Sequence, residues 1–241
     1  TLADGQTLTA DHVLLAPGAT PRKLDIPGAD LQGVFTIRQA TDTQQLLEAC
    51  PSNGRVVISG GSFIGMEAAA SLKSRGLQVT VVAPDDTPFA KNFGQEIGVR
   101  LRRLHEEKGV TYLAGRRIVG VEGDERVHGV RLDDGTHLDT DIVLVGIGVH
   151  PATSFAASLA TDDGGIDVDD SMRTSAAGVY VAGDCARIAH GDSRLRIEHW
   201  RSAQVQGRQV ARTITGQPGP AHFLPWFWTQ QFDCKLEYAG Y

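Results

Sequence analysis

The sequence is poor in cysteine and in aromatic residues. Its 241 residues include three cysteines, Cys50, Cys185 and Cys234, which lie far apart and form no CxxC or CxxxxC pair. Within these residues this excludes a redox dithiol motif and a zinc site of the usual ligand spacing. Sparse, unpaired cysteine is typical of the reducing cytoplasm, so we expect a cytoplasmic protein.

The chain also lacks an excess of basic residues and any long hydrophobic run. Lysine and arginine number 23 against 29 aspartates and glutamates, which gives a formal charge of −6. Such a chain is a poor match for a phosphate backbone, so we expect no nucleic-acid partner. No apolar run approaches the roughly 20 residues that a membrane helix needs, so we expect no membrane association.

Glycine, by contrast, is abundant. The 28 glycines and the 41% of hydrophobic residues are typical of buried strands and helices joined by tight turns. The length allows one or two domains with a large core. The composition therefore favours an α/β protein.

Two segments of the chain repeat each other. Residues 1–21 and 131–151 coincide at nine positions without a gap. Each copy has an Asp-Gly turn of hairpin type followed by a buried apolar strand, which predicts two related domains. Because a glycine-rich turn precedes only the second copy, we expect another such turn upstream of Thr1. We therefore expect this chain to be a piece of a longer protein, truncated at both ends.

The glycine-rich turn belongs to the stretch VVISGGSFIG at 56–65. The pattern predicts a buried parallel strand over 55–59, a helix over 66–75 that is capped by Gly76, and a second strand over 77–82. This is the strand–turn–helix–strand context of a dinucleotide-binding fingerprint. Its candidate cofactor-binding residues are Gly60, Gly61, Ser62, Phe63, Ile64 and Gly65.

Ser62 stands where the fingerprint usually has its second glycine. Serine is small, so the backbone can still approach phosphates if its φ is negative, and its hydroxyl could donate to a phosphate oxygen. The helix N-terminus adds N–H groups and the positive end of its dipole. The alternative is a glycine-rich turn that holds no ligand.

The residues after the second strand bear on the choice of nucleotide. An acidic residue there binds ribose hydroxyls and repels a 2′-phosphate. Ala83 occupies the usual acidic position, Asp85 and Asp86 follow it, and no basic residue comes before Lys91. The pattern favours NAD over NADP, with Asp85 as the candidate ligand; the alternative is that Asp85 is a turn residue after Pro84.

Several further motifs carry a family resemblance. They are LLAPGATPR (14–22), VVISGGSFIGMEAA (56–69), VLVGIGVHP (143–151), GVYVAGDCA (178–186), IEHWRSAQVQGRQVA (197–211) and PWFWTQQFDCKL (225–236). Together they resemble the two-dinucleotide-domain flavoprotein reductases of the pyridine nucleotide-disulfide oxidoreductase superfamily. The branch they resemble contains the ferredoxin and rubredoxin reductases and the apoptosis-inducing-factor-like proteins.

The resemblance implies two Rossmann-like three-layer α/β domains that bind FAD and NAD. Residues 1–45 would end the first segment of an incomplete FAD domain, and 46–140 would form the NAD domain. Residues 141–215 would return to the FAD domain, and 216–241 would begin an α+β C-terminal interface domain.

The resemblance also implies cofactor contacts outside the glycine-rich turn. Arg22 would neutralise FAD phosphates, and Asp184, at a strand end that opens onto a helix, would accept a hydrogen bond from an FAD hydroxyl. Trp200 would contribute a backbone contact near the flavin ring. The other implied positions are Glu198, Ile64, Glu67 and Gly148, on the nicotinamide side. The alternatives are an exposed turn arginine for Arg22, a helix N-cap for Asp184 and a solvated glutamate for Glu67.

The implied activity is transfer of a hydride from NADH to FAD and of electrons onward to a ferredoxin, rubredoxin or Rieske-type iron–sulfur acceptor. No side chain would act as a catalytic nucleophile, and Cys185 is expected to be a small buried residue. The alternatives are a non-catalytic NAD-binding fragment and a disulfide reductase of the same superfamily. A homodimer is compatible with the resemblance. His105, beside the apolar stripe of Ile97, Leu101 and Leu104, has no predicted role.

Overall fold

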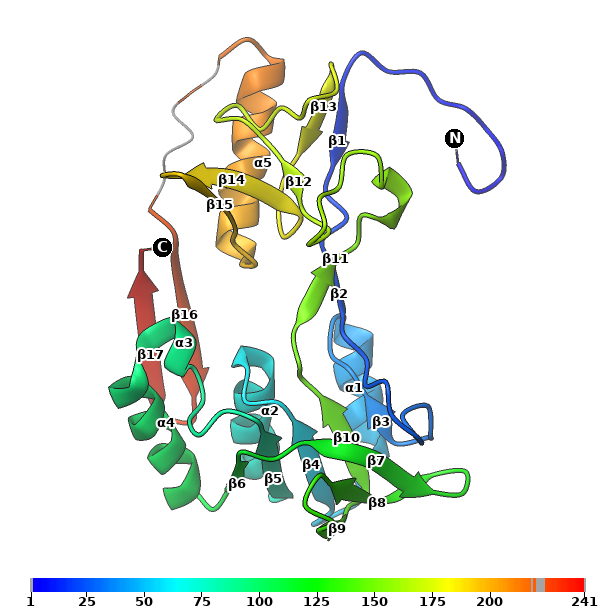
Figure 1. Cartoon of the computed structure of the whole chain (residues 1–241), viewed down its shortest axis with the longest axis vertical. Coiled ribbons are helices and arrows are strands. Elements are labelled where there is room, and N and C mark those ends of the chain that lie inside the picture. Colours follow the sequence, from blue (N-terminus) through cyan, green and yellow to red (C-terminus); the bar gives the residue numbers. More distant parts are fainter. Residues whose placement is uncertain (1, 218, 220–223, 241) are drawn as a thin grey trace. The chain divides into compact units, whose positions relative to one another are not determined.

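The computed structural model describes residues 2–217, 219 and 224–240. The chain divides into two compact units, neither of which is continuous in sequence (Figure 1). Unit 1 contains the described parts of 2–20, 150–228 and 237–240, and unit 2 contains 21–149 and 229–236. The domain boundaries predicted at 45, 140 and 215 remain a prediction.

Unit 2 is built on a five-stranded parallel sheet. Its spatial order is β3 (Val34–Phe35), β10 (Ile142–Val145), β4 (Arg55–Ser59), β5 (Gln78–Ala83) and β6 (Thr111–Ala114). The central strands are runs of β-branched and other apolar residues, because both faces of a parallel sheet are covered. The predicted strands at 55–59 and 77–82 are therefore β4 and, shifted by one residue, β5.

Helices cover one face of this sheet. They are α1 (Ala40–Ala49), α2 (Phe63–Ser74), the short α3 (Ala90–Phe93) and α4 (Gln95–Glu107). Alternate strand residues such as Ile58 and Val81 pack with Met66 of α2 and Leu101 of α4 in one core cluster. Phe232, between β16 (Trp226–Gln231) and β17 (Cys234–Ala239), packs against the same cluster.

The opposite face carries an antiparallel sheet of three strands. Strands β7 (Ile118–Gly123), β8 (Val127–Leu132) and β9 (His137–Asp139) follow each other in sequence and in space. Val57 and Val143, which point away from the helices, pack with Val130 in a second cluster. Unit 2 thus has three layers, helices, parallel sheet and antiparallel sheet, and the predicted Rossmann-like α/β class is confirmed.

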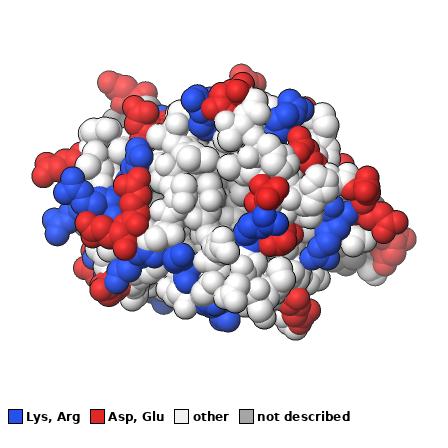
Figure 2. Space-filling view, turned by 90° about the horizontal axis from the view of Figure 1, so that it is seen from below, with Lys and Arg blue, Asp and Glu red and all other residues white. Residues whose placement is uncertain are grey.

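The surface of unit 2 mixes charges of both signs. Ion pairs such as Arg55–Asp139 at 2.8 Å and Arg116–Asp134 at 2.7 Å join neighbouring segments. Figure 2 shows lysine and arginine interspersed with aspartate and glutamate on the face in view.

Unit 1 contains fewer helices and strands than unit 2 among the described residues. The strands β1 (Val13–Leu15) and β13 (Val179–Val181) pair in parallel, and β12 (Ile166–Asp167), β14 (Ala186–His190) and β15 (Ser193–Arg196) form a second sheet. Helix α5 (Trp200–Ile214) contributes Val210 to a core with Val181 and Cys185. Unit 1 also contains the 3-10 helix η1 (Ser154–Ala156). The paired strands β2 (Ala19–Pro21) and β11 (Val149–Pro151) each include a residue of unit 2, Pro21 and Val149.

The turns of the two copies of the sequence repeat share one local structure, although the second turn joins the antiparallel strands β8 and β9 and residues 2–12 around the first turn form no strand. Gly5 and Gly135 have φ values of 84° and 87° in their turns. Asp4 and Asp134 each accept, at Oδ1, the backbone N–H two residues on, at 3.0 and 2.9 Å. The first copy continues from its turn to β1 in unit 1, and the second continues through β9 to β10 in unit 2; β1 and β10 both pair in parallel with their neighbours. Strand β10 is buried as predicted, whereas Val13 and Leu14 of β1 are 43% and 44% exposed. Among the helices of the described residues, none has the length and apolarity needed to cross a bilayer.

Candidate functional site

The glycine-rich turn lies at the carboxyl edge of the parallel sheet, at the point where the strand order reverses. From β4 the chain proceeds through β5 to β6 on one side, whereas β10 pairs with β4 on the other side. The turn follows β4 directly and meets the loop after β10, since the N–H of Gly146 donates to the carbonyl of Ser59 at 2.8 Å. Open α/β sheets bind ligands in the crevice at such a switch point.

Two glycines of the turn are required by close backbone approach. A Cβ at Gly60, whose φ is 106°, would lie 2.5 Å from the carbonyl oxygen of Gly146. A Cβ at Gly65 would lie 2.2 Å from the carbonyl oxygen of Gly60. The turn is therefore folded tightly onto itself and onto the loop after β10, and side chains larger than hydrogen do not fit at either position.

Helix α2 begins at Phe63, three residues before the predicted start at residue 66. The reason is Ser62, which is the N-cap: its Oγ accepts the N–H of Gly65 at 3.4 Å. Because the helix starts earlier, its first-turn N–H groups, which lack intrahelical acceptors, lie within the glycine-rich motif itself. This places the positive end of the helix dipole at the switch point.

The hydroxyl of Ser62 has a different role from the one predicted. Its φ is −78°, as the small-residue argument required, but Oγ donates its proton to the carbonyl of Gly146 at 2.6 Å. A hydroxyl has one proton, so in this conformation it does not donate to a phosphate oxygen. The hydrogen bond of Ser62 instead connects the N-terminus of α2 to the loop after β10.

Three further residues of the motif face different surroundings along α2. Phe63 stacks on Phe89 with ring centroids 4.7 Å apart and belongs to the apolar core. Ile64 is 37% exposed. Glu67 is half-buried and accepts a 2.6 Å hydrogen bond from the hydroxyl of Thr229, so it is not simply a solvated glutamate.

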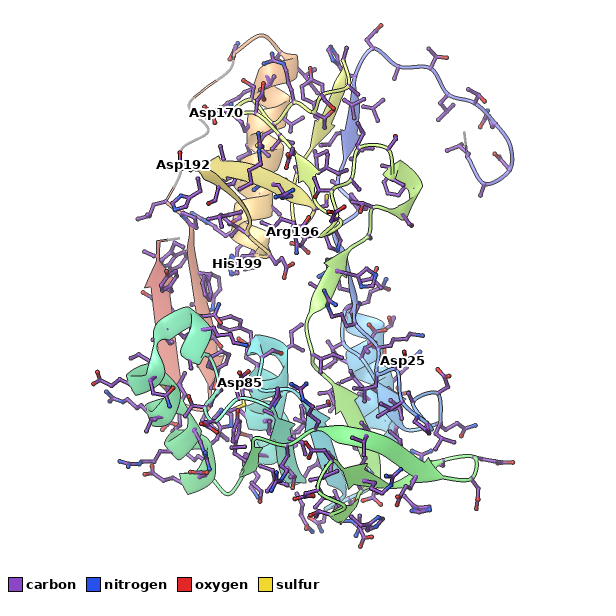
Figure 3. The ribbon with its side chains drawn as sticks, in the orientation of Figure 1. Asp25, Asp85, Asp170, Asp192, Arg196 and His199 are labelled. Carbon is purple, nitrogen blue, oxygen red and sulfur yellow. The ribbon has the colours of Figure 1, made fainter. Side chains whose placement is uncertain are left out.

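Asp85 follows β5 at the same edge of the sheet (Figure 3). Its carboxylate lies 3.4 Å from the ammonium of Lys91, and both side chains are exposed. Lys91, the first basic residue after the two carboxylates in the sequence, lies in α3 and is thus close to Asp85 in space as well. The backbone carbonyl of Asp85 also accepts the phenol of Tyr112 at 3.2 Å, and burial, with a smaller effect of the Asp85 charge, raises the pKa of Tyr112 to about 12.

Arg22 and Gly148, both in unit 2, lie together. The backbone N–H of Arg22 donates to the carbonyl of Gly148 at 2.9 Å, and its Nε donates to the carbonyl of Val149 at 3.1 Å. Gly148 has a φ of 97°, and within the described part of the chain no atom lies within 4 Å of an added Cβ. A backbone hydrogen bond thus joins Arg22, the predicted ligand of FAD phosphates, to Gly148, which was predicted on the nicotinamide side.

Asp184, in unit 1, follows β13 but does not open onto a helix. It lies in a turn that leads into β14, so neither the predicted helix nor a helix N-cap occurs there. The carbonyl of Asp184 accepts Nη1 of Arg196 at 3.2 Å, and the same nitrogen donates to Glu198 at 2.5 Å. Arg196, labelled in Figure 3, thereby ties together two of the predicted cofactor residues of unit 1.

The N-terminus of α5 carries an aromatic cluster. His199 is the N-cap of α5, and burial lowers its pKa. Trp200, the first helical residue, is 51% exposed and meets the Trp228 ring edge-on at 5.6 Å between centroids. Cys185 is fully buried, as expected for a small core residue.

Sequence reasoning missed a buried polar pair in unit 2. His105 has no exposed surface, and its Nε2 lies 2.8 Å from Oε1 of Gln231, 126 residues later. Burial lowers the pKa of His105, and the hydrogen bond to Gln231 opposes that effect. The four-residue spacing from Leu101 was the available signal, because it places His105 on the same buried face of the helix. Within the described residues no cluster of His, Cys, Asp and Glu could hold a metal ion.

Comparison with known proteins identifies a family whose members share these features. The model of the pyridine nucleotide-disulphide oxidoreductase family matches residues 1–207. A ferredoxin reductase subunit of a 5,5′-dehydrodivanillate O-demethylase from a Sphingobium species is 37% identical, over 100% of this chain and 60% of its own length. The chain thus spans about 60% of the length of this curated relative.

Two solved structures have the same fold. A ferredoxin reductase from Rhodopseudomonas palustris matches with a TM-score of 0.92 and 35% identity, over 98% of this chain and 59% of that one. The covalent complex of putidaredoxin reductase with putidaredoxin matches with a TM-score of 0.93 and 28% identity, over 99% and 59%. The glycine-rich turn, its parallel sheet and the family match over residues 1–207 lead to one conclusion: the chain belongs to the pyridine nucleotide-disulphide oxidoreductase family.

Proposed function

We propose that the intact protein is an NADH-dependent flavoprotein reductase that passes electrons to a ferredoxin-type iron–sulfur protein. The observation that carries this proposal is the turn at 60–65, which stands at the switch point of the parallel sheet and opens α2. The similarity to two ferredoxin reductases supports the acceptor class.

The residues of unit 2 fit a dinucleotide. At Gly60 and Gly65 other backbone atoms lie so close that no side chain would fit. These two positions of the turn therefore consist of backbone atoms alone. The hydrogen bond of Ser62 to Gly146 holds the start of α2 at that turn. The free N–H groups of the first turn of α2 can there donate hydrogen bonds to a pyrophosphate. Ile64 and Glu67, three residues apart on α2, offer an apolar and an anionic contact on one side of the helix.

The residues of unit 1 fit part of a flavin dinucleotide. Gln206 is buried, and its Oε1 accepts the N–H of Gly183 at 2.7 Å, next to Asp184. Its Nε2 has no hydrogen-bond partner among the described residues, although a buried amide donor normally has one. A polar group of a bound cofactor would satisfy this donor, with Asp184, Glu198 and Trp200 as the neighbouring contacts. FAD, when bound, supplies both hydride acceptance and single-electron transfer, so the chain needs no nucleophile of its own.

The preference for NADH over NADPH is the finer part of the proposal. Asp85 and Asp86 follow β5, where a carboxylate would accept ribose hydroxyls and repel a 2′-phosphate. Lys91 partly offsets the charge of Asp85. We therefore expect Lys91→Ala to increase the preference for NADH and Asp85→Asn to decrease it. An unchanged ratio of NADH to NADPH affinity in Asp85→Asn, or equal affinity for the two nucleotides in the wild type, would refute the role of Asp85.

Two measurements test the function. Titration of the chain with NADH and with ADP-ribose tests the nucleotide site, and absence of binding for both would refute it. For the intact protein, NADH-driven reduction of cytochrome c should depend on added ferredoxin, and the purified protein should show visible flavin absorption. A protein that instead reduces a small disulfide and ignores ferredoxin would be a disulfide reductase.

A further inference from the structure

Four side chains of unit 2 form one continuous line of hydrogen bonds. His105 of α4 lies 2.8 Å from Gln231, Gln231 lies 3.2 Å from Thr229, and the Thr229 hydroxyl lies 2.6 Å from Oε1 of Glu67 on α2. His105, Gln231 and Thr229 have exposed fractions of 0%, 1% and 2%. The line therefore runs through the interior and ends at a residue of the glycine-rich motif's own helix.

The chemistry of these groups determines the direction of every bond. A carboxylate only accepts, so the single proton of the Thr229 hydroxyl points to Glu67 at the short distance of 2.6 Å. The Thr229 oxygen must then accept from the amide nitrogen of Gln231, which leaves the amide oxygen facing His105. His105 therefore donates from Nε2, and each donor points toward Glu67.

This line is not explained by packing alone. The Nδ1 atom of His105 is buried and has no hydrogen-bond partner among the described residues, so the histidine carries an uncompensated polar atom in the core of this part of the chain. An apolar pair of similar volume at 105 and 231 would avoid that cost and be nearly neutral for folding. The polar residues at 105 and 231 are therefore better explained by their effect on the position of the Glu67 carboxylate than by a contribution to core stability.

Glu67 is half-buried and keeps one carboxylate oxygen without a partner among the described residues. Its one hydrogen bond within the described residues uses Oε1, so Oε2 has no partner there. Ile64, on the same side of α2, is 37% exposed. Glu67 thus presents an acceptor beside an accessible apolar side chain, close to the nucleotide turn.

We propose that Thr229, Gln231 and His105 are positioning residues that hold the carboxylate of Glu67, so that Oε2 accepts a hydrogen bond from the carboxamide of a bound nicotinamide. The proposal rests on the proposed function, because it assumes that the turn at 60–65 binds NADH. The hydrogen-bond line preorganises the acceptor, and its loss weakens binding of the nicotinamide half alone.

The test compares NADH with ADP-ribose, which lacks the nicotinamide, in calorimetric titrations of the chain and its variants. Thr229→Val removes the hydroxyl at constant shape and should weaken NADH binding about tenfold while leaving ADP-ribose unchanged. Thr229→Ser keeps a hydroxyl and should restore NADH binding. His105→Leu combined with Gln231→Leu should weaken NADH in the same direction while the melting temperature stays near that of the wild type.

Gln230→Leu is the matched control, since Gln230 is the exposed neighbour of Gln231 on the same strand and should change neither affinity. Equal loss of both ligands in Thr229→Val would overturn the proposal and indicate a general disturbance of the turn. A wild-type chain that binds NADH no more tightly than ADP-ribose would overturn it while leaving the nucleotide site intact. Failure to bind either ligand would refute the proposed function, and this inference with it.

Discussion

Replacement of Gly65 by alanine tests the architecture of the glycine-rich turn directly. The added Cβ would lie 2.2 Å from the carbonyl oxygen of Gly60, whereas ordinary contacts begin at 3.4 Å. The neighbour is backbone, and Gly60 is itself confined by Gly146, so no flexible side chain can move aside. The helix start and the turn must therefore separate.

The expected magnitude follows from two opposing effects. Overpacking that displaces backbone in a well-packed region costs about 1–3 kcal/mol of folding free energy. Alanine has a better intrinsic helix propensity than glycine by up to about 1 kcal/mol. Because Gly65 is in the first turn of α2, the steric effect dominates, and we expect a net loss of about 1–2 kcal/mol, or about 2–8 °C in melting temperature.

Binding should suffer more than stability. A separation of about 1 Å between the helix start and the turn exceeds the tolerance of about 0.5 Å within which a preorganised site retains its geometry. We expect at least about a tenfold loss of ADP-ribose affinity, measured by calorimetry alongside thermal unfolding followed by circular dichroism.

Gly207→Ala is the matched control for Gly65→Ala. Gly207 lies within α5, and an added Cβ there meets no atom of the described residues within 4 Å, so alanine should raise stability by about 0.5–1 kcal/mol. If Gly65→Ala were as stable as Gly207→Ala and bound ADP-ribose as tightly as the wild type, the close-approach argument would be refuted.

Three further predictions concern single polar groups. Ser62→Ala should cost about 1–2 kcal/mol in urea unfolding, because it removes the N-cap and leaves the Gly146 carbonyl unpaired, whereas an unchanged midpoint would contradict the capping role. The pKa of His137 is raised, chiefly by its hydrogen bond to Asp139, so its contribution to stability is present below its ordinary pKa near 6.5 and is lost as pH rises through the higher folded pKa. The melting temperature of the wild type should thus fall relative to that of His137→Gln between about pH 6 and pH 8, and parallel curves would contradict this. Burial raises the pKa of Tyr112 to about 12, so ultraviolet titration should show a phenol that ionises late and is absent from Tyr112→Phe.

Local pattern was sufficient for the elements around the turn. The strand predicted over 55–59 is β4, because a short β-branched run between turn residues depends on little beyond itself. The repeat predicted equivalent turns, and Gly5 and Gly135 have nearly equal φ values. The start of α2 was placed three residues late, since Ser62 is both a plausible turn residue and a strong N-cap.

Partners distant in sequence were decided by the tertiary structure. The Ser62 hydroxyl binds a carbonyl 84 residues later, Lys91 folds back onto Asp85, and His105 meets Gln231 across 126 residues. Propensity and periodicity depend on residues a few positions apart in the sequence. They predict on which face of a helix or strand a side chain lies, but not which distant residue it contacts. Residue order thus determined the strand, the glycine-rich turn and its helix, while the packing of β10, α3 and α4 around them decided which atoms each polar side chain binds.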